Sequence, residues 1–300
     1  MKNICHRTCL VFALAAILTG ACQSGNKAGE AGADKKAEDK SIEIVYVEWS
    51  DAVASTNVVK AVLEDMGYKV DTIPVSAAAM WQSTATGDSD AFVAAWLPTT
   101  HAHYLKAVKD KVELLGPNLE GTRIGLVVPA YVNMSSIEDL PTNAEKFNSR
   151  IIGIDPGAGL MSKTEKAIDE YGLSGIELVE GSDATMVGAL QSAIKKEQWI
   201  VVTGWTPHWK FARWDLKFLD DPKKVYGGDG NIGTVVRLGL KEDMPDAYYL
   251  LDHFKWDSSE LEKVMSWNRE KGTTPAENAR RWIAENPETV SSWKPVSHRQ

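Results

Sequence analysis

Cysteine is missing from almost the whole of this 300-residue chain. The three cysteines, Cys5, Cys9 and Cys22, all lie near the N-terminus. The rest of the chain therefore offers no disulfide, no thiolate nucleophile and no cysteine ligand for a metal. It also has no Gly-x-Ser-x-Gly elbow and no phosphate-binding Gly-Lys-Ser/Thr loop. His101 and His103 have a spacing that suits metal ligands on a strand, but no partner set of acids or histidines stands out nearby. We therefore expect no metal, no cofactor and no catalytic residues.

An excess of positive charge and a long apolar run are missing as well. The formal net charge is -8 at pH 7, with 44% apolar and 25% charged residues. This acidic balance argues against nucleic acid, and against an anionic membrane surface, as a partner. The apolar run over residues 10–18 is too short for a membrane-spanning helix, and no other stretch approaches the necessary length.

The N-terminus has the pattern of an export signal. Lys2 and Arg7 precede the short apolar run, and small residues lead directly to Cys22. This pattern resembles a lipoprotein signal peptide over residues 1–21. It predicts acylation of Cys22 and an extracytoplasmic protein that its lipid anchors to the membrane, on the cell-surface or periplasmic side. Thr19 stands where such signals usually have leucine, so ordinary secretory cleavage is the alternative.

The body of the chain alternates strands and helices. Runs of β-branched and aromatic residues indicate strands, and apolar residues at helical spacing indicate helices. The first β-α-β-α-β set predicts a parallel sheet with right-handed crossovers, and a second set follows it. The predicted strands are 42–49, 68–75, 90–96, 124–131, 151–155, 177–179, 199–204 and 232–240. The predicted helices before the C-terminal region are 57–66, 77–85, 163–171 and 184–195.

The C-terminal region is predicted to be helical. Ser259 with Glu262 has the spacing of a capping box, and Thr274 precedes a proline and the acid Glu277. Four large apolar residues lie at core-like spacing in this region and are predicted to pack: Trp267, Trp282, Ile283 and Trp293.

Two α/β sets, with a chain that leaves the first and later returns, predict an α/β fold of two lobes. Lobe 1 would contain residues 41–125 and 233–300, and lobe 2 residues 126–232. A ligand cleft would lie between the lobes, which could close on it by hinge motion. Residues 22–40 are rich in small and charged residues and have no aromatic residue, which predicts a disordered tether.

Three of the 11 tryptophans share one context. Trp49, Trp96 and Trp205 each end or directly follow a predicted strand. Three indoles brought together could form a box for a quaternary ammonium group, which neither donates nor accepts a hydrogen bond and binds aromatic faces. The alternative is that these tryptophans only close the core of the sheet.

A glycine turn could bind the anionic end of a ligand. Asp155-Pro-Gly-Ala-Gly159-Leu160 joins a predicted strand to a helix and exposes the first backbone amides of that helix. The turn is too short for a dinucleotide fingerprint and suits a carboxylate. His101, five residues after Trp96, could add a side-chain donor. A tight turn without a ligand, and a capping or surface histidine, are the alternatives.

These motifs resemble those of the glycine betaine-binding proteins of ABC importers. The resemblance rests on Trp49-Ser-Asp, Trp96-Leu-Pro-Thr-Thr-His101, the Gly159 turn and Gly-Trp205-Thr-Pro-His-Trp, and it covers about residues 42–295. It implies a type II-like periplasmic-binding-protein fold with its cleft between the lobes. It also implies a cage of the three tryptophans, with the amides of Gly159 and Leu160 and the side chain of His101 on the carboxylate. The implied partners are ABC permease subunits with their cytoplasmic ATPase.

Two other functions stay open at this point. Choline or carnitine could be the main ligand, although choline has no carboxylate for the predicted anion site. An extracytoplasmic enzyme acting on a betaine would need a base or a nucleophile beside the cage, and the sequence offers no candidate.

Overall fold

The computed structural model describes residues 40–299, and by their contacts these form one compact unit that begins at Lys40. The predicted signal peptide, the predicted acylation site Cys22 and almost all of the predicted tether lie outside the described residues. Among residues 40–299, no helix is both long and apolar enough to cross a membrane.

One mixed β-sheet organises the described residues. Its strands follow the order β2-β1-β3-β9-β4-β7-β5-β6, with β8 paired to β4. The strands β1, β2 and β3 are parallel to one another, as predicted, whereas β9 is antiparallel to β3 and β4. The bounds are β1 Ser41–Tyr46, β2 Lys69–Pro74, β3 Ala91–Leu97, β4 Val112–Pro129, β5 Arg150–Ile152, β6 Glu177–Val179, β7 Val201–Thr206, β8 Leu216–Phe218 and β9 Gly230–Arg237.

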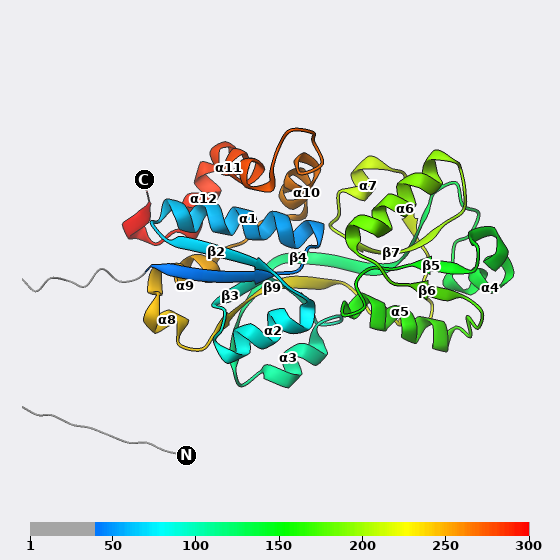
Figure 1. Cartoon of the computed structure of the whole chain (residues 1–300), viewed down its shortest axis with the longest axis horizontal. Coiled ribbons are helices and arrows are strands. Elements are labelled where there is room, and N and C mark those ends of the chain that lie inside the picture. The colour runs from blue at the N-terminus through cyan, green and yellow to red at the C-terminus, as the bar shows by residue number, and fades with distance from the viewer. Residues whose placement is uncertain (1–39, 300) are drawn as a thin grey trace, which may run out of the picture. The chain divides into compact units, whose positions relative to one another are not determined.

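Strand β4 connects the two parts of the sheet. Its first part, as far as Thr122, pairs with β9, and its second part, from Arg123, pairs with β7. Figure 1 shows this strand running from one part of the sheet to the other. The sequence predicted only the second part, because Gly116 and Pro117 interrupt the first and its register to β9 shifts at three places. The lobe boundaries predicted near residues 125 and 232 stay a prediction.

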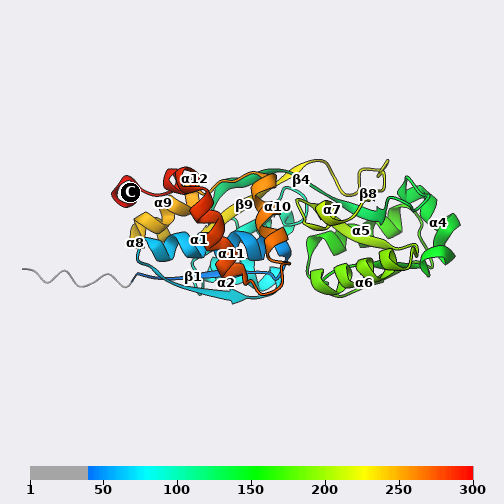
Figure 2. The ribbon, with the colours of Figure 1, turned by 90° about the horizontal axis from the view of Figure 1, so that it is seen from above.

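Helices cover the sheet on both sides (Figures 1 and 2). Helix α1 packs against β2, β3, α10 and α11, while α5 and α6 pack against β7. The helices are α1 Ser50–Asp65, α2 Ala77–Thr86, α3 Ala102–Val108, α4 Leu140–Asn143, α5 Gly159–Glu170, α6 Asp183–Lys195, α7 Lys210–Arg213, α8 Leu240–Asp243, α9 Pro245–His253, α10 Ser258–Trp267, α11 Pro275–Glu285 and α12 Pro287–Trp293. Three short 3₁₀ segments are η1 Ile137–Asp139, η2 Ala144–Phe147 and η3 Val296–His298.

Two helices begin earlier than predicted, and both begin next to a predicted site residue. Helix α1 starts at Ser50, directly after Trp49, whereas the predicted start was residue 57. Helix α5 starts at Gly159, whereas the predicted start was residue 163. The first residues of α1 are mostly small or polar, so the apolar periodicity that marks a helix begins later. In α5, Leu160 and Met161 directly follow Gly159 and were counted with the glycine turn, not with the helix.

One predicted cap of the C-terminal helices is wrong and the other is confirmed. The capping box of α10 is formed by Asp257 and Glu260, not by Ser259 and Glu262. Asp257 accepts a hydrogen bond from the amide of Glu260 at 3.0 Å, so the helix starts one residue before Ser259. Thr274 caps α11 as predicted. The predicted packing of the large apolar residues in the C-terminal region is largely confirmed. Trp282 and Trp293 are fully buried and stack on each other, with ring centroids 5.6 Å apart.

Candidate functional site

One cavity contains all six predicted ligand-binding residues in its lining. Strand β3 and the loop after it bring Trp96 and His101, and Trp49 stands at the N-cap position of α1. Strand β7 brings Trp205, and the first turn of α5 brings the glycine turn. The lining residues are Trp49, Asp51, Trp96, Thr100, His101, Ile124, Ile154, Ala158, Gly159, Leu160 and Trp205.

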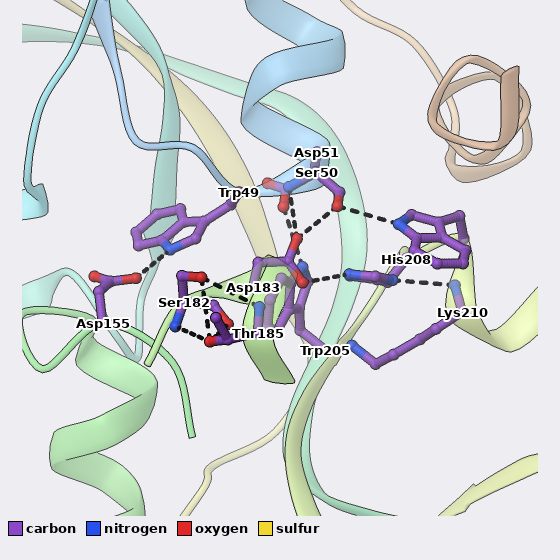
Figure 3. Close-up of polar contacts among 11 residues, drawn as sticks. Trp49, Ser50, Asp51, Asp155, Ser182, Asp183, Thr185, Trp205, His208 and Lys210 are labelled. Carbon is purple, nitrogen blue, oxygen red and sulfur yellow. Dashed lines mark hydrogen bonds and ion pairs between the residues drawn. The ribbon is translucent and has the colours of Figure 1, made fainter. Parts of the chain in front are cut away.

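Carboxylates hold the polar edges of the three indoles. The Nε1 atoms of Trp96 and Trp205 donate to the two carboxylate oxygens of Asp51, at 3.2 and 3.1 Å. Trp49 donates from Nε1 to Oδ1 of Asp155 at 2.8 Å (Figure 3). An indole has a single N–H group, so these bonds leave only ring carbons to line the cavity. Such a lining can hold a cation only through the ring faces, without a hydrogen bond.

Asp51 is the site residue that the sequence analysis missed. It is 1% exposed, lies in the first turn of α1 and lines the cavity. Burial raises its pKa to about 6, and the nearby Asp183 carboxylate acts in the same direction, against the hydrogen bonds from Trp205 and Trp96. The sequence offered one indication of a role for Asp51, because this acid stands two residues after the predicted cage residue Trp49. Only the fold shows that it meets Trp96 and Trp205.

The N-terminus of α5 also lines the cavity, through Ala158, Gly159 and Leu160. Its N-cap residue, Ala158, has no side-chain acceptor, and among residues 40–299 the amides of Gly159 and Leu160 donate to no other residue. A Cβ atom on Gly159 would collide with the backbone of Thr100. A larger residue would therefore push the helix terminus away from the loop that follows β3. Two free amides at a helix N-terminus are suited to an anion.

His101 is buried and has a fixed tautomer. Its Nδ1 atom accepts hydrogen bonds from the backbone amide of Trp96 at 3.1 Å and from Nε1 of Trp81 at 3.4 Å. The proton therefore resides on Nε2, which makes no hydrogen bond among residues 40–299 and remains available as a donor. Burial lowers the pKa of His101 to about 3. The alternative of a capping or surface histidine is wrong, because the ring is 1% exposed and makes no capping bond to α3.

A second buried polar network lies beside the cavity (Figure 3). Oδ2 of Asp183 accepts from the amide and the hydroxyl of Ser50, at 2.9 and 2.5 Å. Nδ1 of His208 accepts from the amide of Lys210 at 3.1 Å, so its Nε2 carries the proton and donates to Oδ1 of Asp183 at 3.0 Å. Burial alone would raise the pKa of Asp183, but His208 and Lys210 hold it well below its usual range. This network joins the N-terminus of α1 to that of α6.

The described residues include no group of three or more histidine, aspartate or glutamate side chains arranged to hold a metal ion. The two histidines with metal-like spacing, His101 and His103, have different surroundings. His101 is buried at the cavity, whereas His103 is exposed and packs on Tyr104, with ring centroids 3.9 Å apart.

Known proteins of one family match this chain. A family model described as the substrate binding domain of ABC-type glycine betaine transport system matches residues 40–285. The glycine betaine/carnitine transport binding protein GbuC of Listeria monocytogenes is 50% identical over 151 residues. This alignment covers 50% of this chain and 50% of that protein, so the chain spans about half the length of this curated relative.

Two crystal structures are similar over most of the chain. The glycine/betaine/L-proline-binding protein ProX of Borrelia burgdorferi is 43% identical, with a TM-score of 0.84 over 86% of this chain and 98% of that one. Lactococcal OpuAC, in a closed conformation complexed with glycine betaine, is also 43% identical, with a TM-score of 0.82 over 86% of this chain and 100% of that one. These likenesses confirm the predicted α/β fold of periplasmic binding proteins and the predicted resemblance.

The tautomer of His101 leads to a prediction for the ligand-free protein. Nitrogen-15 NMR should find the proton on Nε2, and this signal should not titrate between about pH 8 and pH 5, where free histidine added to the sample does titrate. The physical reason is that burial disfavours the charged ring. A His101 signal that titrates near pH 6.5, or a proton on Nδ1, would contradict this geometry.

Proposed function

Since this chain belongs to the family of substrate-binding domains of ABC-type glycine betaine transport systems, we propose that it captures glycine betaine outside the cytoplasm. It then delivers the ligand to the permease subunits of an importer that is powered by a cytoplasmic ATPase. The observation that carries this proposal is that a single cavity combines three indoles with three unpaired N–H donors.

The cation end of the site consists of Trp49, Trp96 and Trp205. Each is nearly buried, at 4 to 6% exposed, and each has its N–H bound to a carboxylate. Their ring faces surround the trimethylammonium group of betaine, and a desolvated contact of this kind contributes roughly 1–2 kcal/mol per ring. The ionised carboxylate of Asp51 adds a negative charge beside the cage.

The carboxylate end consists of the amides of Gly159 and Leu160 and the Nε2 atom of His101. Each can donate a hydrogen bond to the betaine carboxylate, and such charge-assisted bonds contribute roughly 1.5–3 kcal/mol each. The dipole of α5 favours the same anion. The three donors come from both predicted lobes, so hinge closure would bring them together on one ligand.

Among ligands that share the quaternary ammonium group, we expect the affinity to depend on whether the ligand has a carboxylate for the amides of α5 and for His101. Carnitine has a carboxylate, and the name of the Listeria relative includes it. Choline has no carboxylate and leaves the donors of Gly159, Leu160 and His101 unpaired in a water-excluded site, which costs affinity. We therefore place betaine first, carnitine next and choline last.

We propose binding without chemical conversion. The ionisable residues in the cavity lining are Asp51 and His101. Both oxygens of Asp51 accept indole N–H groups, and His101 remains neutral with its basic nitrogen occupied. Neither is free to act as a nucleophile or a general base on a bound betaine.

The first prediction for this function concerns Trp96. The change Trp96→Ala removes one face of the cage and should weaken betaine binding at least about tenfold in calorimetry. The matched control is Trp199→Ala, because Trp199 is half-buried and does not line the cavity. Thermal unfolding should show that both variants are folded. Wild-type affinity in Trp96→Ala would contradict the cage.

A second prediction concerns the charge of Asp51, whose pKa is raised to about 6. Its carboxylate is ionised above this pH and attracts the trimethylammonium group, and it is neutral below. Betaine affinity should therefore fall by about tenfold as the pH falls from about 7 to about 4.5. Asp51→Asn removes the charge at every pH, so its affinity should be low and nearly independent of pH. A wild-type affinity that stays constant over this range would contradict a role of this charge.

We also propose that the protein is held at the membrane by a lipid on Cys22, which lies outside the described residues. In a host that processes lipoproteins, Cys22→Ser should move the protein from the membrane fraction to the soluble fraction. Cys9→Ser, inside the proposed signal peptide, should leave it at the membrane. Mass spectrometry of the mature N-terminus tests the same point, and an unmodified first residue would speak for ordinary secretory cleavage.

A further inference from the structure

Lys210 is a buried lysine that the proposed capture of betaine does not use. Its side chain is 0% exposed, and its Nζ atom has no hydrogen-bond partner among residues 40–299. The nitrogen lies 4.2 Å from the ring centroid of Trp205 and 5.5 Å from that of Phe211. An ammonium group without a hydrogen bond is costly to bury, so its position beside a cage tryptophan calls for an explanation.

The ammonium packs on Trp205 from outside the cavity. Trp205 lines the cavity, whereas Lys210 does not. We infer that the Nζ atom contacts the part of the indole that is turned away from the cavity. Figure 3 shows the end of the lysine side chain next to Trp205. A cation in the cage and the Lys210 ammonium are thus separated by little more than one aromatic ring.

The groups around Lys210 determine its charge. Asp183 on α6 and Asp51 on α1 favour the ammonium form, whereas burial disfavours it and dominates, lowering the pKa to about 7. His208, just before α7, donates to Asp183, and its own pKa is lowered to about 4 by burial and by Lys210, so the ring is neutral at pH 7. Arg269 lowers the pKa of His208 further and faces the Trp209 ring at 5.0 Å.

We propose that Lys210 is a specificity-determining residue that disfavours ligands with a net positive charge and so selects zwitterions such as betaine over cations such as choline. This inference rests on the proposed function. A choline cation in the cage is repelled by the ammonium behind Trp205. A betaine in the same position is repelled at its trimethylammonium group and attracted at its carboxylate, so most of the penalty cancels.

The size of the effect follows from the separation of the charges. Two cations on opposite sides of one ring are roughly 8 Å apart, and at the effective dielectric constant of protein sites, about 20, their repulsion weakens binding by about thirtyfold when Lys210 is fully charged. For a zwitterion the corresponding factor is about threefold or less. Removing the charge of Lys210 should therefore strengthen the binding of choline much more than that of betaine.

The experiment is a calorimetric titration of betaine and of choline into wild type and Lys210→Met at about pH 6.5 and pH 8.5. In the wild type, choline should bind about fourfold tighter at the higher pH, where Lys210 has lost its proton, while betaine changes by about twofold or less. Lys210→Met should bind choline about fourfold tighter than wild type at pH 6.5, where Lys210 is mostly protonated, and should show little change with pH. The ratio of the betaine affinity to the choline affinity reports on the charge of Lys210. A loss of packing alone would weaken the binding of both ligands and leave this ratio unchanged.

Lys146→Met is the matched control. Lys146 is exposed, and its Nζ atom lies 4.5 Å from the ring centroid of Trp199, which does not line the cavity. This variant should keep both wild-type affinities. The inference is overturned if the betaine-to-choline ratio of the wild type is the same at both pH values, or if Lys210→Met leaves it unchanged. The wild-type titration tests this even if Lys210→Met fails to fold. If wild type binds no betaine at either pH, the proposed function itself is wrong.

Discussion

The site depends on the carboxylate of Asp51, which accepts one indole N–H on each of its two oxygens. Trp96 and Trp205 come from strands that are not neighbours in the sheet, with β9 and β4 between them. The carboxylate therefore fixes the relative orientation of two rings that no shared backbone pairing could fix. It also removes the only polar atom of each ring from the cavity. The apolar character of the cage is thus a consequence of a buried acid.

Buried acids of this kind are tolerated because the charges around them are nearly balanced. Asp183 has three hydrogen-bond donors from Ser50 and His208, and both Asp183 and Asp51 favour the ammonium form of Lys210. For Asp51, burial and the neighbouring Asp183 outweigh the hydrogen bonds that it accepts, so its pKa is raised. The ionised Asp51 favours a quaternary ammonium group in the cage. The proposed repulsion from Lys210 penalises that group less when the ligand also carries a carboxylate.

The sequence predicted the parts of this site that correspond to patterns of neighbouring residues. Tryptophans at the ends of predicted strands, the glycine turn and a histidine five residues after Trp96 are visible as patterns within a few residues. The resemblance to betaine-binding proteins then implied a role for each of these six residues, and all six line the cavity. The sequence could not predict the role of Asp51, whose partners are 45 and 154 residues away. The first part of β4 was missed because Gly116 and Pro117 break the strand pattern, although pairing with β9 holds it in place. Local propensity yields to tertiary pairing there.

The same bonds that orient the rings also connect the two predicted lobes. Trp49 donates to Asp155, Trp205 donates to Asp51, and Ser50 donates to Asp183. Each pair joins residues 41–125 to residues 126–232. The first residues of α1 therefore take part both in orienting the cage and in connecting the two predicted lobes. The proposed ligand would add the contacts that no residue among 40–299 supplies, a cation between the rings and an anion at the start of α5. Separation of the predicted lobes would break the cage and the anion site alike, so we expect a zwitterion to favour the arrangement in which the lobes are together.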